Sequence, residues 1–137
     1  MRPYQHKVQY YETDQMKVVH HSNYIRWFEE ARIDYMEQLG MPYEDMEKNG
    51  IISPVISVEA EYLRMVKFGD TVVIEAKIKE YNGIKLTIGY SVVDESTGMV
   101  HCRGITRHCF LNEKGRPVSL KRECPQYHEM FLKGLEA

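Results

Sequence analysis

The fold is decided by residues 23–39, which read NYIRWFEEARIDYMEQL. At about 100° per residue, five apolar side chains cluster within about 120° of arc: Ile25, Phe28, Tyr35, Met36 and Leu39. The pattern predicts an amphipathic helix about 25 Å long, enough to cross a small sheet. We expect Ser22 or Asn23 to cap its start, and Gly40 and Pro42 to end it.

Strand-like segments lie on both sides of this helix. Apolar and polar residues alternate with period two in residues 4–12, 56–62, 72–78 and 86–92, and a turn leads into a fifth expected strand, 100–111. In residues 56–62 the apolar face carries Ile56, Val58, Ala60 and Tyr62. The pair Asn82-Gly83 predicts a two-residue hairpin. Short helices are expected at residues 45–49 and 125–135.

The order of these elements indicates an α+β fold, in which one face of an antiparallel five-stranded sheet is covered by a single long helix. A chain of 137 residues with 43% apolar content predicts one domain spanning residues 1–137. One helix cannot cover the edges of such a sheet, and an exposed edge strand invites pairing with a second copy. A homodimer is therefore expected.

Charge and hydropathy exclude several classes of function. The formal net charge is −2, with acidic and basic residues interspersed, so we expect no nucleic-acid partner. No apolar run reaches the roughly 20 residues of a membrane span, and the first ten residues, MRPYQHKVQY, lack a signal-peptide core. These features predict a cytoplasmic protein with no integral membrane segment.

The three cysteines are Cys102, Cys109 and Cys124, an odd number for a disulfide framework. On one strand, Cys102 and Cys109 would lie about 23 Å apart at roughly 3.3 Å per residue, on opposite faces. Reduced structural thiols are expected, since neither has an activating neighbour in the sequence. No His-x-x-x-His or Cys-x-x-Cys spacing predicts a metal site.

The chemistry is expected in residues 10–24, YYETDQMKVVHHSNY, which run from a strand end to the start of the long helix. A helix N-terminus presents unpaired amides that stabilise negative charge on a carbonyl oxygen. Asp14 could attack a thioester carbonyl or deprotonate a water, while the amide near His21 receives the oxyanion. Alternatively, Asp14 is an ordinary loop aspartate that accepts a hydrogen bond from its own backbone.

Two further interpretations concern neighbouring residues. His20 and His21 could supply a base or a hydrogen-bond donor, although adjacent loop histidines are expected to point in different directions. Glu29 lies at the border of the apolar stripe, where a carboxylate needs a partner. An intrahelical pair with Arg32 is the simplest partner, and a role in fixing the loop of Asp14 or in facing the substrate is the alternative.

At this motif the sequence resembles the 4-hydroxybenzoyl-CoA thioesterase family of hotdog proteins. The similarity lies in Tyr10 to Tyr24, followed by Trp27-Phe28-Glu29-Glu30-Ala31-Arg32. It continues in Glu61-Tyr62-Leu63-Arg64, Phe68-Gly69-Asp70, Gly104-Ile105-Thr106-Arg107 and Gly115-Arg116-Pro117. The resemblance covers nearly the whole chain.

The resemblance implies a hotdog fold, with the sheet wrapped around one long central helix, and hydrolysis of acyl-CoA thioesters to free acid and CoA. Asp14 takes the place of the family's catalytic carboxylate, and the His21 amide that of the group polarising the thioester. Substrate contacts are expected from Val19, Tyr24, Glu29, Arg64 and Lys67. The family is a homodimer or homotetramer and needs neither metal nor other cofactor.

Two departures from the family pattern stand out. Glu12 replaces an aspartate, and Lys17 replaces a common glycine, where lysine would be strained if the backbone turns left-handed. For the CoA phosphates, Arg64, Lys67 and Arg107 are candidates by position.

Two other functional classes stay open at this point. One is a non-catalytic acyl-thioester binding module, and the other is a hotdog hydratase or dehydratase that uses His21 with Glu29. Acyl length, and CoA against acyl carrier protein as the carrier, are left open by the sequence.

Overall fold

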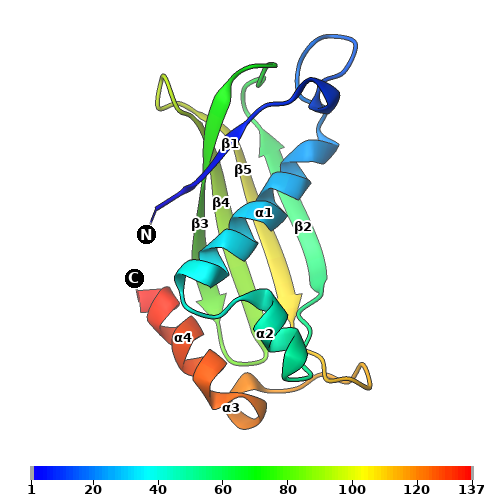
Figure 1. Cartoon of the computed structure of the whole chain (residues 1–137), viewed down its shortest axis with the longest axis vertical. Coiled ribbons are helices and arrows are strands. Elements are labelled where there is room, and N and C mark those ends of the chain that lie inside the picture. Colours follow the sequence, from blue (N-terminus) through cyan, green and yellow to red (C-terminus); the bar gives the residue numbers. More distant parts are fainter. Residues whose placement is uncertain (1, 137) are drawn as a thin grey trace. The chain divides into compact units, whose positions relative to one another are not determined.

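The computed structural model describes residues 2–136, which form two compact units. Unit 1 comprises residues 1–35, 59–76 and 90–104, and unit 2 comprises residues 36–58, 77–89 and 105–137. The elements are β1 (Tyr4–Lys7), η1 (Tyr10–Glu12), α1 (Ser22–Gln38), α2 (Tyr43–Lys48), β2 (Val55–Tyr62), β3 (Thr71–Tyr81), β4 (Lys85–Asp94), β5 (Val100–Cys109), α3 (Leu120–Glu123) and α4 (Pro125–Glu136). All of them except η1 are labelled in Figure 1.

The strands form one five-stranded sheet in the order β1-β3-β4-β5-β2. β1 pairs antiparallel with β3, with Tyr4 opposite Ile74. The expected α+β class and hotdog fold, with a five-stranded antiparallel sheet, are confirmed, and α1 is a 17-residue helix. No helix within residues 2–136 is long and apolar enough to cross a membrane.

In unit 1, the first part of α1 packs closely on the sheet. The Phe28 ring stacks on Tyr90 of β4, with centroids 4.6 Å apart. It also lies over Gly104 of β5, where an added Cβ would come within 2.3 Å of the ring. Trp27 and Phe28 are both fully buried. The close approach of α1 to β5 therefore depends on a residue without a side chain.

The buried face of α1 differs from the predicted stripe. Ile25 is 43% exposed, whereas Tyr24 and Trp27 are buried. Because Ile25 lies about 100° around the helix from Tyr24, it falls at the side of the face that the aromatic rings define. The capping prediction was also wrong. Ser22 Oγ contacts His20 Nδ1, and Asn23 Nδ2 donates to the Glu12 carbonyl, so both side chains face the preceding loop.

The first strand is shorter than predicted. β1 ends at Lys7, and residues 10–12 form a 3-10 turn in place of the extended chain that was expected up to Glu12. The Glu12 carboxylate folds back to accept the Gln9 amide at 2.8 Å, which closes the turn. This turn places the residues that follow it beside the start of α1.

In unit 2, the predicted hairpin joins β3 to β4 through residues 82–84, one residue longer than expected. Gly83 has a φ of 90°, which favours glycine, and Asn82 Oδ1 accepts the Ile84 and Lys85 amides. The predicted helices at residues 45–49 and 125–135 are present as α2 and α4, and α3 was not predicted. The Tyr81 hydroxyl lies 2.8 Å from His128 Nδ1 of α4.

β2 matches the predicted strand to within one residue, but its apolar face is largely exposed. It lies at an edge of the sheet, and three of the four apolar side chains that the alternation places on one face are exposed: Ile56 54%, Val58 37% and Tyr62 47%. By contrast, the apolar faces of β3 and β4 are buried at Val72, Ile74, Ile78, Leu86, Ile88, Tyr90 and Val92. An edge strand has a neighbour on one side only, so its side chains are covered less.

Candidate active site

The segment between η1 and α1 is a hairpin-like loop in unit 1. Thr13 and Val19 form an antiparallel bridge, and the Asp14 amide donates to the Val18 carbonyl at 2.9 Å. Lys17 turns the loop with a φ of 65°, the left-handed conformation in which a residue other than glycine is strained. The loop thus returns the chain to His20, directly before α1.

Asp14 lies exposed near the start of this loop. Its Oδ1 accepts the Met16 amide at 2.7 Å, which is the local backbone contact of the alternative interpretation. Within residues 2–136, Oδ2 has no hydrogen-bond partner. One carboxylate oxygen therefore orients the side chain, and the other is available to a substrate or a water.

The amides around the start of α1 are nearly all engaged. His20 N donates to Glu12 O, Asn23 N to His20 O, and Tyr24 N to His21 O. Ser22 N donates to His20 Nδ1 at 3.2 Å. In the described part of the chain, the His21 amide alone in this run has no acceptor. From the sequence, this same amide is expected to stabilise the oxyanion by donating a hydrogen bond.

The two adjacent histidines do not diverge as predicted. The rings of His20 and His21 stack, with centroids 4.2 Å apart and planes 30° from parallel. His20 Nδ1 is held by Ser22 Oγ at 2.9 Å, and the Tyr62 hydroxyl donates to the His21 carbonyl at 3.4 Å. His21 is exposed, so its side chain is accessible beside its unpaired amide.

Val19, at the end of the loop, and Tyr24, near the start of α1, are both buried. They are 6% and 4% exposed, and the Val19 amide donates to the Val66 carbonyl at 2.8 Å. Burial raises the pKa of Tyr24 to about 12, so its hydroxyl stays protonated near neutral pH. The Tyr24 ring lies 5.1 Å from that of Tyr62. These contacts suit a rigid support, not an acid-base group.

The other predicted site residues are less closely joined to the loop. Glu29 is exposed, and the expected pair with Arg32 is absent from the described residues, because Arg32 Nη1 donates to the Tyr90 hydroxyl at 3.1 Å. Lys67 forms a backbone bridge with Val18, which brings it beside the loop, whereas Arg64 pairs through its amide with His101. Both lysine and arginine are exposed.

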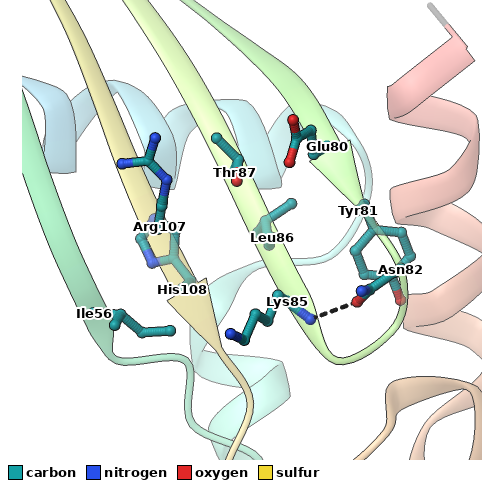
Figure 2. A pocket seen from close by; sticks show the side chains of 9 residues that line it. All are labelled: Ile56, Glu80, Tyr81, Asn82, Lys85, Leu86, Thr87, Arg107 and His108. Carbon is teal, nitrogen blue, oxygen red and sulfur yellow. Dashed lines mark hydrogen bonds between the residues drawn. The ribbon is translucent and has the colours of Figure 1, made fainter.

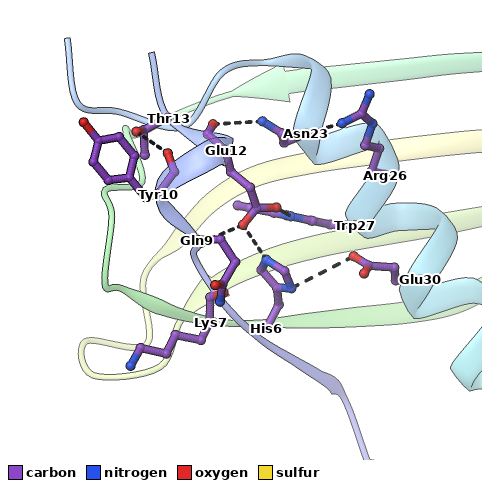
Figure 3. Close-up of polar contacts among 10 residues, drawn as sticks. All are labelled: His6, Lys7, Gln9, Tyr10, Glu12, Thr13, Asn23, Arg26, Trp27 and Glu30. Atoms are coloured by element: carbon purple, nitrogen blue, oxygen red, sulfur yellow. Dashed lines mark hydrogen bonds and ion pairs between the residues drawn. The ribbon is translucent and has the colours of Figure 1, made fainter. Parts of the chain in front are cut away.

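Sequence reasoning missed the role of Glu12, noted only as a departure from the family pattern. Its side chain is buried and contacts His6 and Trp27 (Figure 3). Burial by itself would raise its pKa, but hydrogen bonds from the Gln9 amide, His6 and Trp27 hold the pKa below the ordinary value. Glu12 is therefore ionised at neutral pH. Only the unusual residue type signalled it in the sequence.

Apart from this loop, a concave region with a volume of about 330 Å³ lies in unit 2 (Figure 2). Its charged lining comprises Arg107 of β5, Lys85 of β4 and Glu80 of β3, with Ile56 of β2 at one side. Arg107 Nη1 contacts Ser57 Oγ at 3.4 Å. The region thus presents two cations and one carboxylate, a lining that could receive an anionic group.

The thiols take no part in either region. All three cysteines are free, as predicted. Burial raises the pKa of Cys102 to about 12, so this thiol is not a thiolate nucleophile at neutral pH. Within residues 2–136, no three His, Cys, Asp or Glu side chains gather to hold a metal.

Comparison with known proteins bears on the same segments. Residues 8–133 match the family described as the thioesterase-like superfamily. The chain is 34% identical over 128 residues to a protein of Bacillus subtilis (strain 168) named "Putative acyl-CoA thioesterase YneP", covering 93% of this chain and 92% of that protein. It is 25% identical to the acyl-CoA thioesterase YbgC of Haemophilus influenzae, covering 85% and 86% of the two. A solved structure of a DHNA-CoA thioesterase from Staphylococcus aureus is similar with a TM-score of 0.90 and 35% identity, covering 94% of this chain and 87% of that one.

Proposed function

Because the chain belongs to the thioesterase-like superfamily, we propose that it hydrolyses acyl-CoA thioesters. In this proposal Asp14 is the catalytic carboxylate, and the His21 amide donates the hydrogen bond that polarises the thioester carbonyl. One observation carries this proposal: the His21 amide lies at the start of α1 and has no hydrogen-bond acceptor within residues 2–136. We further propose that the chain acts as a single domain, of the 4-hydroxybenzoyl-CoA thioesterase type within the superfamily.

The chemistry requires a donor for the carbonyl oxygen and a source of oxygen for the carbonyl carbon. The His21 N–H and the positive end of α1 stabilise the negative charge that develops as the carbon becomes tetrahedral. Asp14 Oδ2 either attacks that carbon to give an acyl anhydride, which water then cleaves, or takes a proton from an attacking water. In both routes the C–S bond breaks, and CoA leaves as a thiolate that takes up a proton.

Asp14→Asn tests the assignment. The amide keeps the size of the side chain and can still accept the Met16 amide, but it neither attacks nor deprotonates water. We expect kcat to fall by about 100- to 10,000-fold with the melting temperature unchanged. Free-thiol release over a panel of aliphatic and aromatic acyl-CoAs is the measurement, and it also reads acyl preference.

Asp70→Asn is the matched control, since Asp70 Oδ2 likewise accepts one backbone amide, that of Lys67, at 2.9 Å. This variant should retain wild-type turnover. An Asp14→Asn enzyme with wild-type kcat on every acyl-CoA that the parent hydrolyses would remove Asp14 from the mechanism.

We also infer a homodimer that forms through β2. This edge strand exposes Val55 at 44%, Ile56 at 54% and Val58 at 37%, which an isolated chain would leave in water. Val58→Asp should shift the molar mass measured by light scattering toward the monomer. Ser57→Asp is the control, because it adds the same charge at the neighbouring, half-buried position and should leave the molar mass at that of the dimer.

A further inference from the structure

Glu12 joins three segments of unit 1 (Figure 3). Its carboxylate Oε1 accepts the Gln9 amide of the preceding turn and lies 2.8 Å from His6 Nε2 of β1. Its Oε2 accepts Trp27 Nε1 of α1 at 2.7 Å. Because an ionised carboxylate only accepts hydrogen bonds, His6 Nε2 carries the proton in this contact. The residue itself is 4% exposed.

The main chain of Glu12 binds the same region a second time. Its carbonyl oxygen accepts the His20 amide and Asn23 Nδ2, both at 2.8 Å. His20 ends the loop, and Asn23 belongs to the first turn of α1. Side chain and main chain together therefore connect one residue to β1, to the end of the loop and to α1.

These contacts bear directly on the two groups of the proposed mechanism. Asp14 follows Glu12 by two residues, and His21 follows His20 by one. Between them, residues 14–17 are exposed, and the loop is closed by its own turn and by the Thr13–Val19 bridge. The separation between the Asp14 carboxylate and the His21 amide is thus set where Glu12 joins both arms of the loop to α1.

We propose that Glu12 is a positioning residue for thioester hydrolysis, one that holds Asp14 and the His21 amide in register through its contacts with His6, Trp27 and His20. The inference rests on the proposed function of Asp14. Glu12 is enclosed by its protein partners, so it acts through other residues and touches neither substrate nor water in the reaction.

A positioning role predicts a specific kinetic effect. Misplacement of a reacting group by about 1 Å can cost about 100-fold in rate, because the attacking and stabilising groups must meet the same carbonyl. Binding of the acyl and CoA portions does not need that alignment. Loosening the Glu12 contacts should therefore lower kcat and leave KM nearly constant.

The test uses the full-length enzyme with Glu12→Gln, in which the side-chain NH₂ group must face either the Gln9 N–H or the Trp27 Nε1–H, both of which are donors. We expect kcat per folded molecule, measured well below the melting midpoint, to fall about 10- to 100-fold with KM within about twofold. His6→Gln removes the ring partner and keeps Glu12, and it should lower kcat about 3- to 10-fold. Should Glu12→Gln not fold, His6→Gln decides alone.

Glu30→Gln is the matched control. Glu30 lies 4.0 Å from the other ring nitrogen of His6, is 45% exposed at its side chain, and does not contact the loop in the described residues. It should keep wild-type kcat. The inference is overturned if folded Glu12→Gln and His6→Gln enzymes keep wild-type kcat, or if their losses follow the unfolded fraction alone.

The two proposals fail separately. If Asp14→Asn is inactive while folded Glu12→Gln is fully active, only the positioning role is lost. If Asp14→Asn is fully active, the proposed mechanism is lost, whatever Glu12→Gln does.

Discussion

The turn at residues 10–12 and the loop at residues 13–19 are adjacent in the chain but built in opposite ways. The turn ends in Glu12, a buried carboxylate with hydrogen bonds from three partners. The loop begins with Asp14, an exposed carboxylate with one hydrogen bond from its own loop. A carboxylate whose oxygens are all engaged can orient other groups, whereas one with a spare oxygen can react. In the proposed mechanism, Glu12 would therefore hold neighbouring groups in place, and Asp14, two residues later, would take part in the reaction.

The largest effect expected from this comparison is a difference in the free energy of unfolding between variants of Glu12 and of Asp14. Glu12→Ala leaves the buried Trp27 donor and two part-buried donors, from His6 and Gln9, without an acceptor. A buried donor without an acceptor costs about 1–3 kcal/mol, and a part-buried one costs less, so we expect unfolding to be easier by about 3 kcal/mol. Asp14→Ala should change the free energy of unfolding by about 0.5 kcal/mol. Urea denaturation of both variants measures the difference. Similar losses of unfolding free energy for the two variants would show that Glu12 and Asp14 contribute equally to stability, and would contradict the comparison.

The pH dependence of stability is a second test of the role of Glu12. The hydrogen bonds to Glu12 outweigh its burial and hold its pKa below the ordinary value of 4.5 in the folded protein. Its contribution to stability is therefore complete above that value and is lost as pH falls through the lower folded pKa. We expect the difference in melting temperature between wild type and Glu12→Gln to be constant from pH 6 to about 5 and to narrow below about pH 4. A difference that widens on acidification would contradict the sign.

Local patterns predicted those parts of the fold whose partners lie nearby in the chain. The spacing of residues 23–39 gave α1 to within one residue at each end, and Asn82-Gly83 gave the β3–β4 hairpin. The motif at residues 10–24 located the loop and its unpaired amide. Some local predictions also failed: Ser22 contacts His20 in place of capping α1, and the Glu12–Gln9 contact closes a turn where strand was expected. Other failures concern features that depend on position in the sheet. Exposure of the β2 apolar face follows from its edge position, which residue alternation does not report.

The contacts of Glu12 could not be predicted for a related reason. Its partners His6, Gln9 and Trp27 lie 6, 3 and 15 residues away, and no single helix or strand period relates them. They meet only after β1, the turn and α1 have packed. The predicted Glu29–Arg32 pair shows the opposite error. The helical spacing would allow this pair, but Arg32 donates instead to the Tyr90 hydroxyl of β4. Spacing predicts which groups can meet, and packing decides which do.

The smallest expected effect lies in the loop. Lys17 is the one residue other than glycine with positive φ in residues 2–136, at 65°, which costs an L-residue about 1–2 kcal/mol. Lys17→Gly removes that strain but adds freedom to the unfolded chain, worth about 0.5–1 kcal/mol, so we expect a net stabilisation of about 0.5 kcal/mol. Gln15→Gly is the control: it has no such strain to relieve and should only destabilise. If both glycines destabilise alike, the strain at Lys17 is already relieved by the loop, and the loop is less independent of its surroundings than its exposure indicates.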